Sequence, residues 1–170
     1  PIDSNVLDLA CGIGGDTISL AKKTYVTAVD IDPLKIEIAR INIESYGLSN
    51  KVKFIQADAA DLPLKADYAF LDPSRRINGK RTQSLKEMNP SIEFIDRLRN
   101  AIPSFGVKLS PASDDNELES LNTGIEFISE SGECKEAIAW FGDFNPHGVY
   151  AVLLPQKAIV KRNTSTSFEI

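Results

Sequence analysis

The chain has 170 residues, 42% of them hydrophobic, and a formal net charge of −5 at pH 7. This length suits one domain with a full core, and the acidic balance argues against a protein that coats nucleic acid with a broad basic surface. The two cysteines and the single histidine form no metal-ligand spacing and no disulfide framework. No apolar run approaches the roughly 20 residues that span a bilayer, and no signal segment opens the chain. We therefore expect a cytoplasmic protein with no metal site and no membrane partner.

The first half of the chain alternates apolar strands with helices. Apolar residues recur at helical spacing after Gly15 and again after Pro33, which fits a first helical turn, and Gly47 closes the second helix. The last strand of this half lacks polar alternation, which is typical of a strand covered on both faces in a parallel sheet. The expected strands are 5–10, 24–30, 51–57 and 66–71, and the expected helices are 15–23 and 33–46.

The second half begins with a loop over 75–87, where apolar periodicity lapses and four basic residues fall within seven positions. Further along, a Ser-Gly turn between two apolar runs indicates an antiparallel hairpin. The other expected elements are helices over 92–102 and 116–121, a strand over 106–109, hairpin strands over 125–129 and 133–141, and short strands over 149–154 and 158–161, before a polar end.

Alternating strands and helices give an α/β fold with a doubly wound, mostly parallel sheet. We expect seven strands in this sheet, the last two forming the antiparallel hairpin. Because such a sheet binds ligands at the carboxyl ends of its strands, the functional residues should directly follow strands.

Three glycines follow the first strand. Gly12 and Gly14 fit a dinucleotide-binding fingerprint, but Thr17 stands where its third glycine belongs. Asp16, at the start of the next helix, would repel a pyrophosphate and would suit a ligand with an amino group or a sulfonium. The turn therefore favours a cationic ligand over a dinucleotide.

Two further carboxylates fit a nucleoside. Asp30 lies 18 residues after Gly12, near the interval at which an acidic residue holds ribose hydroxyls, although it could also be a strand-ending turn residue. Asp32 competes for the ribose but is better explained as the N-cap of the helix that Pro33 opens. Asp58 could accept a hydrogen bond from the adenine amine or be a solvated loop residue. S-adenosylmethionine fits the positions of Asp16, Asp30 and Asp58 together.

Two segments, DLACGIGGDT at 8–17 and AVDIDP at 28–33, resemble the first two cofactor motifs of class I S-adenosylmethionine-dependent methyltransferases. Within that superfamily the chain most resembles the trimethylguanosine synthase group, over roughly residues 5–144. The resemblance implies a Rossmann-like catalytic domain, which we place at 1–155, with a C-terminal strand or tail at 156–170 that leads to a domain outside this chain. Because the chain starts at Pro1, almost on the first strand, we expect a fragment of a longer protein.

The resemblance also implies roles for individual residues. Three would surround the methionine moiety, two the ribose and two the adenine, while Cys11 would form a small apolar wall of the pocket and Gly14 would belong to the cofactor turn. The three sets are, in that order, Asp8, Gly12 and Asp16; Asp30 and Ile31; and Asp58 and Ala59.

The turn after the fourth strand departs from the family pattern. There, trimethylguanosine synthases and many amino-group methyltransferases have Ser, Asn or Asp, two prolines and an aromatic residue that stacks on the target base; this chain has Asp72-Pro73-Ser74-Arg75-Arg76. Asp72 could accept a hydrogen bond from an amine and orient it for in-line methyl transfer, or the pair with Pro73 could simply end the strand. Arg75 could stack on a base, or it could hold a phosphate with Arg76, or both could be surface charges or form an internal salt bridge. The catalytic candidates are Asp72, Pro73 and Arg75.

These features predict a methyltransferase that acts on RNA, at an exocyclic or ring nitrogen of a purine. A related 5-methyluridine family also has an Asp-Pro turn but needs a nucleophilic cysteine after the fifth strand, where this chain has Lys108-Leu109-Ser110-Pro111. A scaffold module that binds the cofactor without catalysis is the alternative, supported by the missing aromatic residue. A nucleotide-dependent oxidoreductase is disfavoured by Asp16 and the broken glycine pattern.

A late aromatic cluster has two interpretations. Trp140, Phe141 and Phe144 could stack on a base, but packing of the last hairpin strand and its exit loop is the favoured role.

Overall fold

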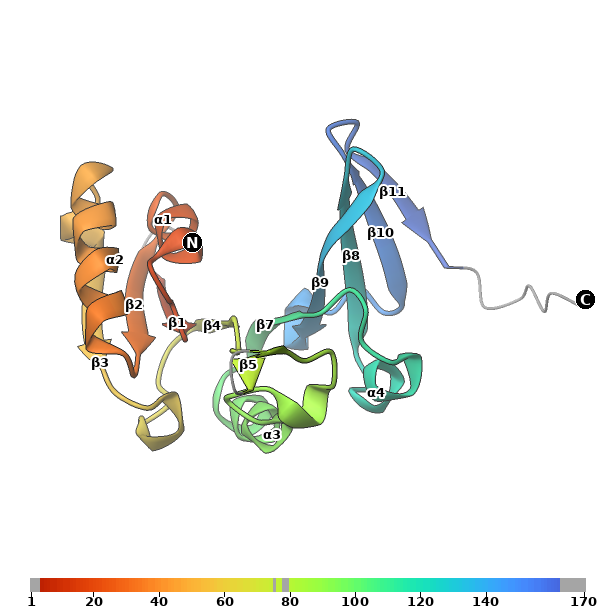
Figure 1. Ribbon diagram of the computed structural model, residues 1–170, viewed down its shortest axis with the longest axis horizontal. Helices are drawn as coiled ribbons and strands as arrows, with labels where there is room; N and C mark the ends of the chain where they lie inside the picture. Colours follow the sequence, from red (N-terminus) through yellow and green to blue (C-terminus); the bar gives the residue numbers. More distant parts are fainter. Residues whose placement is uncertain (1–3, 75, 78–79, 163–170) are drawn as a thin grey trace, which may run out of the picture.

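The computed structural model describes residues 4–74, 76–77 and 80–162, and for 76–77 and 80–81 it describes the main chain alone. Within this part of the chain one nine-stranded sheet forms, in the order β11-β10-β8-β9-β7-β4-β1-β2-β3, beside a small two-stranded hairpin (Figure 1). The strands of the sheet are β1 (Asn5–Leu9), β2 (Tyr25–Asp30), β3 (Val52–Gln56), β4 (Tyr68–Leu71), β7 (Ser104–Leu109), β8 (Gly124–Glu130), β9 (Glu133–Phe141), β10 (Val149–Leu154) and β11 (Ala158–Lys161).

The strand directions confirm a mostly parallel sheet with an antiparallel hairpin. The strands from β3 to β7 run parallel, and β9 pairs antiparallel with both β7 and β8. The sheet exceeds the expected seven strands because β10 adds parallel to β8 and β11 adds antiparallel to β10. Residues 158–161, expected as a short strand, thus complete the sheet as its last strand.

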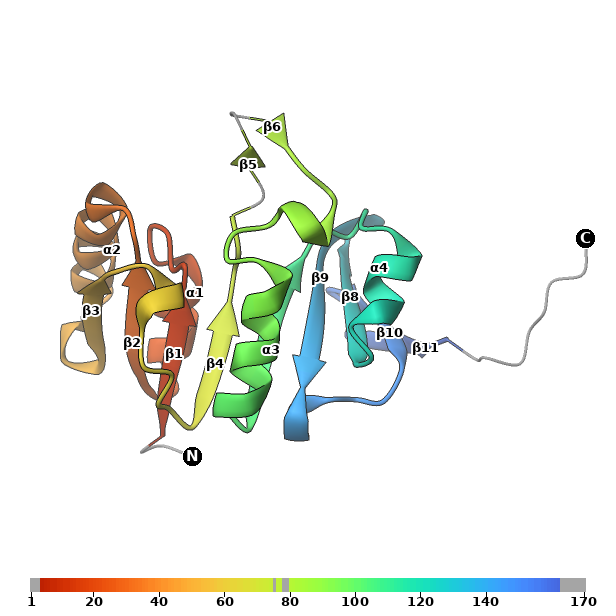
Figure 2. The ribbon, with the colours of Figure 1, turned by 90° about the horizontal axis from the view of Figure 1, so that it is seen from below.

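Helices cover both faces of the sheet, as expected of a doubly wound fold. The helices are α1 (Gly15–Ala21), α2 (Pro33–Ser45), α3 (Ile92–Ala101) and α4 (Asp115–Ser120). Figures 1 and 2 show α3 and α4 on the opposite side of the sheet from α1. The main core cluster includes Phe94, Ile95 and Leu98 of α3, and a smaller cluster packs α1 and α2 against β2. No helix among the described residues is long and apolar enough to cross a membrane.

Local sequence signals fix the ends of several elements. The Asp32 side chain accepts hydrogen bonds from the main-chain N–H groups of Leu34 and Lys35, which confirms it as the N-cap of α2. Ser131 and Gly132, both with positive φ, make the tight turn between β8 and β9. The expected loop over 75–87 holds the short strands β5 (Arg76–Ile77) and β6 (Lys80–Arg81) and a turn of 3-10 helix, η3 (Leu85–Glu87).

The strand order places the cleft at the end of β1. The chain leaves β1 toward β2 on one side, while β4 lies on the other side. A crevice opens where the connections of such a sheet diverge, so the carboxyl ends of β1, β2 and β4 are where a ligand is expected.

Candidate functional site

The turn after β1 depends on its glycines. Gly12 and Gly14 both have positive φ, +57° and +89°, which favours glycine. A Cβ at Gly14 would come within 3.3 Å of the Cβ of Ala39 in α2, whereas one at Gly12 would meet nothing within 4 Å. Gly14 therefore lets the turn pack on α2, and Gly12 faces open space at the site.

Asp30 ties this turn to the end of β2. Its carboxylate is only 4% exposed and accepts hydrogen bonds from the main-chain N–H groups of Gly12, at 2.9 Å, and Asp32, at 3.0 Å. The ammonium of Lys35 lies 3.8 Å away. The predicted ribose residue is thus held rigidly beside the glycine turn.

A small pocket lies beside Asp30 and contains four of the predicted cofactor residues, Asp30, Ile31, Asp58 and Ala59. Asp58 also caps the 3-10 turn η2 (Ala59–Asp61) by accepting a hydrogen bond from Ala60 N–H at 2.8 Å. The same pocket is also lined by four residues that were not predicted from the sequence: Lys35, Ser74, Asn89 and Pro90.

Ser74 and Asn89 close one side of this pocket through two main-chain hydrogen bonds of 2.7 and 2.9 Å. The pairing brings the segment before α3 against the turn that follows β4. No local pattern in the sequence signals a contact between residues 15 positions apart in two irregular segments.

Asp8 lies in β1 directly beneath the turn and is completely buried. The hydroxyl of Thr17 donates a hydrogen bond to its Oδ2, while Oδ1 has no hydrogen-bond partner among the described residues. Burial raises the pKa of this carboxyl to about 7. The negative charges of Asp16 and Asp72 add to this rise, while Thr17 and Lys108 oppose it.

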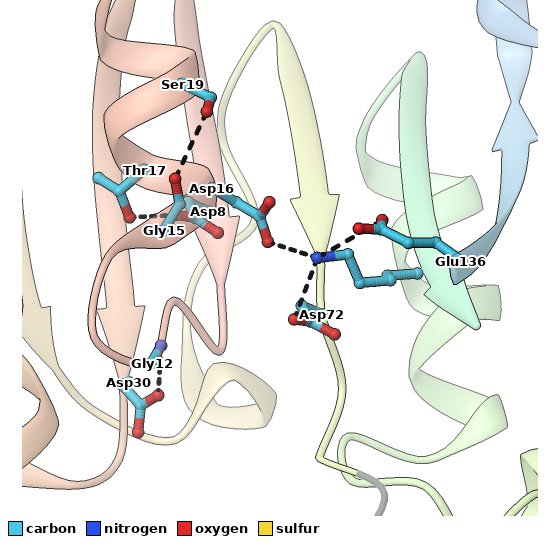
Figure 3. A network of polar contacts seen from close by, with 10 residues as sticks. Asp8, Gly12, Gly15, Asp16, Thr17, Ser19, Asp30, Asp72 and Glu136 are labelled. Atoms are coloured by element: carbon cyan, nitrogen blue, oxygen red, sulfur yellow. Dashed lines mark hydrogen bonds and ion pairs between the residues drawn. The ribbon is translucent and has the colours of Figure 1, made fainter. Parts of the chain in front are cut away.

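Three carboxylates from separate elements converge on the Lys108 ammonium (Figure 3). The Nζ atom lies 2.9 Å from Asp16 Oδ2, 3.4 Å from Asp72 Oδ2 and 3.7 Å from Glu136 Oε2. Burial lowers the pKa of Lys108, but the hydrogen bond to Asp16 and the charges of Asp72, Asp16 and Glu136 outweigh burial and leave it raised. The ammonium therefore stays charged, and it joins the cofactor turn to the turn after β4.

Three other candidate residues are Pro73, Arg75 and Cys11, and the two that the structure describes, Pro73 and Cys11, do not line the pocket beside Asp30. Pro73 is buried, and Arg75 lies outside the described residues. The Cys11 side chain packs in the smaller core cluster and is not among the residues that line the pocket beside Asp30. Burial raises the pKa of this thiol to about 12, so it remains neutral.

Of the three late aromatic residues, Phe141 is the one that is fully packed within the fold, which was the favoured interpretation. Phe144 stacks on Tyr68 but is 42% exposed, and it lines a hollow on the α1 side of the sheet together with Trp140. Phe141 is 4% exposed and stacks on Phe105, and Trp140 donates a hydrogen bond from its indole N–H to Glu126 at 2.7 Å. Trp140 pairs with Gly106 rather than with the carboxyl end of β7, so it lies away from the turn after β4.

A hollow of about 660 Å³ lies along the α1 side of the sheet. Of the predicted site residues only Asp16 lines it, and most of its wall is apolar. The small pocket beside Asp30 carries the polar groups that a nucleoside needs, so we regard it as the better candidate despite its size.

The residues at this edge fit S-adenosylmethionine. The buried Oδ1 of Asp8 has no partner among the described residues, the space at Gly12 is open, and three carboxylates surround one ammonium. A ligand that carries an ammonium and a sulfonium would neutralise the surplus negative charge.

Comparison with known proteins agrees with this geometry. Residues 6–72 match the family model described as a methyltransferase domain. Over 96 residues the chain is 38% identical to Trimethylguanosine synthase of Schizosaccharomyces pombe, a match that covers 50% of this chain and 40% of the relative. These matches support a class I S-adenosylmethionine-dependent methyltransferase. Both the predicted family and S-adenosylmethionine as its cofactor are thereby confirmed.

Two further similarities extend the comparison. It is 41% identical over 95 residues to the 23S rRNA (uracil(1939)-C(5))-methyltransferase RlmD of Shewanella halifaxensis, covering 52% of this chain and 21% of the relative. In fold it resembles a protein of Porphyromonas gingivalis W83 that is provisionally described as a methyltransferase, with a TM-score of 0.74, 21% identity, and coverage of 95% of this chain and 43% of that one. The methyltransferase chain spans less than half the length of each of these three proteins.

Proposed function

We propose that this chain is the catalytic domain of a methyltransferase that modifies RNA at a nitrogen of a purine base. The observation that carries the proposal is the meeting of Asp16 and Asp72 at one ammonium, 2.9 and 3.4 Å from it. The carboxylate that would orient the acceptor therefore lies beside the cofactor turn. Two similar proteins named for a guanosine product and for rRNA methylation support a nucleic-acid acceptor.

In this proposal the cofactor lies across the carboxyl ends of β1, β2 and β3. The methionine moiety is held by three residues, the ribose by two and the adenine by two, with Gly14 shaping the turn. The pocket beside Asp30 supports the nucleoside contacts, and Asp8 Oδ1, which has no hydrogen-bond partner in the described part of the chain, supports the methionine contacts. The sets are Asp8, Gly12 and Asp16; Asp30 and Ile31; and Asp58 and Ala59.

S-adenosylmethionine supplies the methyl group as a sulfonium electrophile. Asp72 accepts a hydrogen bond from the acceptor N–H, which aims the nitrogen lone pair for in-line attack. The nitrogen–carbon bond would form as the cofactor's carbon–sulfur bond breaks, and Asp72 or solvent would take the proton that the nitrogen loses. The main-chain N–H of Asp72 donates to Leu9 O at 3.2 Å, so the turn is anchored to β1 and positioned for this role.

The positions of the two cysteines favour a nitrogen acceptor over uracil C5. Covalent pyrimidine methylation needs a cysteine after the fifth strand of the parallel series, and Ser110-Pro111 stands there. The two cysteines are Cys11, which is buried, and Cys134, at the start of β9. Neither lies at the end of β7.

Transfer of a labelled methyl group from S-adenosylmethionine to bulk RNA tests the proposal. We expect label in methylated purine nucleosides after digestion, and its loss in Asp72→Ala with cofactor binding retained. Asp96→Ala, an exposed carboxylate on α3, is the control and should keep the label. Equal labelling in Asp72→Ala would remove this residue from catalysis, and label in 5-methyluridine would refute the purine acceptor. Cofactor binding without any transfer would support the scaffold alternative.

A further inference from the structure

Lys108 is unusual for its place in the fold. It lies in β7, where every other residue of the strand is buried and uncharged, and its own side chain is 15% exposed. A lysine in such a strand needs counter-ions that reach it from neighbouring elements. Three carboxylates do so, from α1, from the turn after β4 and from β9.

The contacts of Lys108 are unequal. Asp16 is closest at 2.9 Å, and Asp72 and Glu136 follow at 3.4 and 3.7 Å. An ammonium has three protons to donate, so loss of one contact leaves two carboxylates to hold it. Lys108 can therefore give up Asp16 without becoming a buried charge that lacks a partner.

The charge balance of the cluster favours such an exchange. One ammonium faces three carboxylates, so the cluster accommodates a second cation better than an anion. Asp16 is the member assigned to the methionine moiety, whose α-ammonium needs a carboxylate. Two ammonium groups that compete for one carboxylate repel each other, which opposes binding of either.

We propose that Lys108 is a positioning residue that holds Asp16 and Asp72 together until the cofactor binds, when the cofactor's α-ammonium replaces it on Asp16 and leaves it with Asp72 and Glu136. This inference rests on the proposed function. Binding of the cofactor and the position of the Asp72 carboxylate then both depend on the Lys108 side chain. Lys108 thus competes with the cofactor's amino group for Asp16, and it keeps its contact with Asp72 whether or not the cofactor is bound.

Calorimetric titration with two neutral nucleosides separates this role from a merely structural one. S-adenosylhomocysteine carries the α-ammonium, whereas 5′-methylthioadenosine lacks the amino-acid part and never meets Asp16. In Lys108→Met we expect binding of S-adenosylhomocysteine to tighten about tenfold, because the competing charge is gone, while binding of methylthioadenosine changes by less than about twofold. Lys108→Arg keeps the charge and should keep the wild-type ratio of the two affinities.

A double-variant cycle ties the effect to Asp16. In an Asp16→Asn background Lys108→Met should no longer tighten S-adenosylhomocysteine binding, because the shared carboxylate is absent. Thermal melts establish that each variant is folded before it is titrated. An equal change for both ligands in Lys108→Met, or no change for either, would overturn the role of Lys108 alone. If the wild-type protein binds neither ligand, the cofactor assignment fails and this inference fails with it.

Discussion

Asp8 makes folding stability depend on pH in an unusual direction. Burial raises its pKa from an ordinary 3.8 to about 7 in the folded protein. The folded state therefore holds a proton that the unfolded chain releases above pH 4. This proton's stabilisation of the folded state is complete at low pH and is lost as pH rises toward 7. The full loss is about 4 kcal/mol, of which about 2.5 kcal/mol falls between pH 5 and pH 8.

Asp8→Asn removes this titration while the side chain can still accept the hydrogen bond from Thr17. Free energies of unfolding from denaturant titrations at pH 5 and pH 8 measure the effect. We expect the wild-type protein to lose about 2.5 kcal/mol more than Asp8→Asn between these two pH values. Asp96→Asn, which removes an exposed carboxyl on α3, should retain the wild-type pH dependence. A difference between wild type and Asp8→Asn that stays constant with pH would refute the assignment of a buried, protonated Asp8.

Two other predictions follow from named contacts. If the cofactor's cation lies beside Asp8, its binding at pH 6.5 should release about 0.8 of a proton from the wild-type protein and none from Asp8→Asn. Calorimetry in buffers of different ionisation enthalpy measures this release, and equal release by both proteins would contradict the prediction. Gly106→Ala should destabilise the fold by about 1–3 kcal/mol, because its Cβ would lie 2.7 Å from the ring of Trp140. Gly15→Ala, where a Cβ meets nothing within 4 Å, is the control for thermal melts, and equal melting of the two variants would show that the strand adapts.

Local signals account for what the sequence predicted well. The N-cap at Asp32, the helix that starts at Pro33 and the turn at 131–132 each depend on residues a few positions apart. The strands 149–154 and 158–161 were predicted with their observed limits. The glycine turn could also be predicted, because the strand before it and the helix after it are both evident in the sequence.

The Lys108 cluster could not be predicted in the same way. Lys108 lies 92 residues after Asp16 and joins it only because β7 is placed two strands from β1. Glu136 reaches the cluster through the antiparallel register of β7 and β9, in which Lys108 pairs with Ile138. The one available signal was a lysine within an apolar strand, which indicates a buried counter-ion but not its identity.

Calorimetric titration of the wild-type protein with S-adenosylmethionine, S-adenosylhomocysteine and NAD tests whether the turn after β1 belongs to a methyl-donor site. We expect both sulfur nucleosides to bind at one site and NAD not to bind, because Asp16 repels a pyrophosphate at the turn after β1. Binding of NAD without binding of S-adenosylmethionine would contradict this expectation.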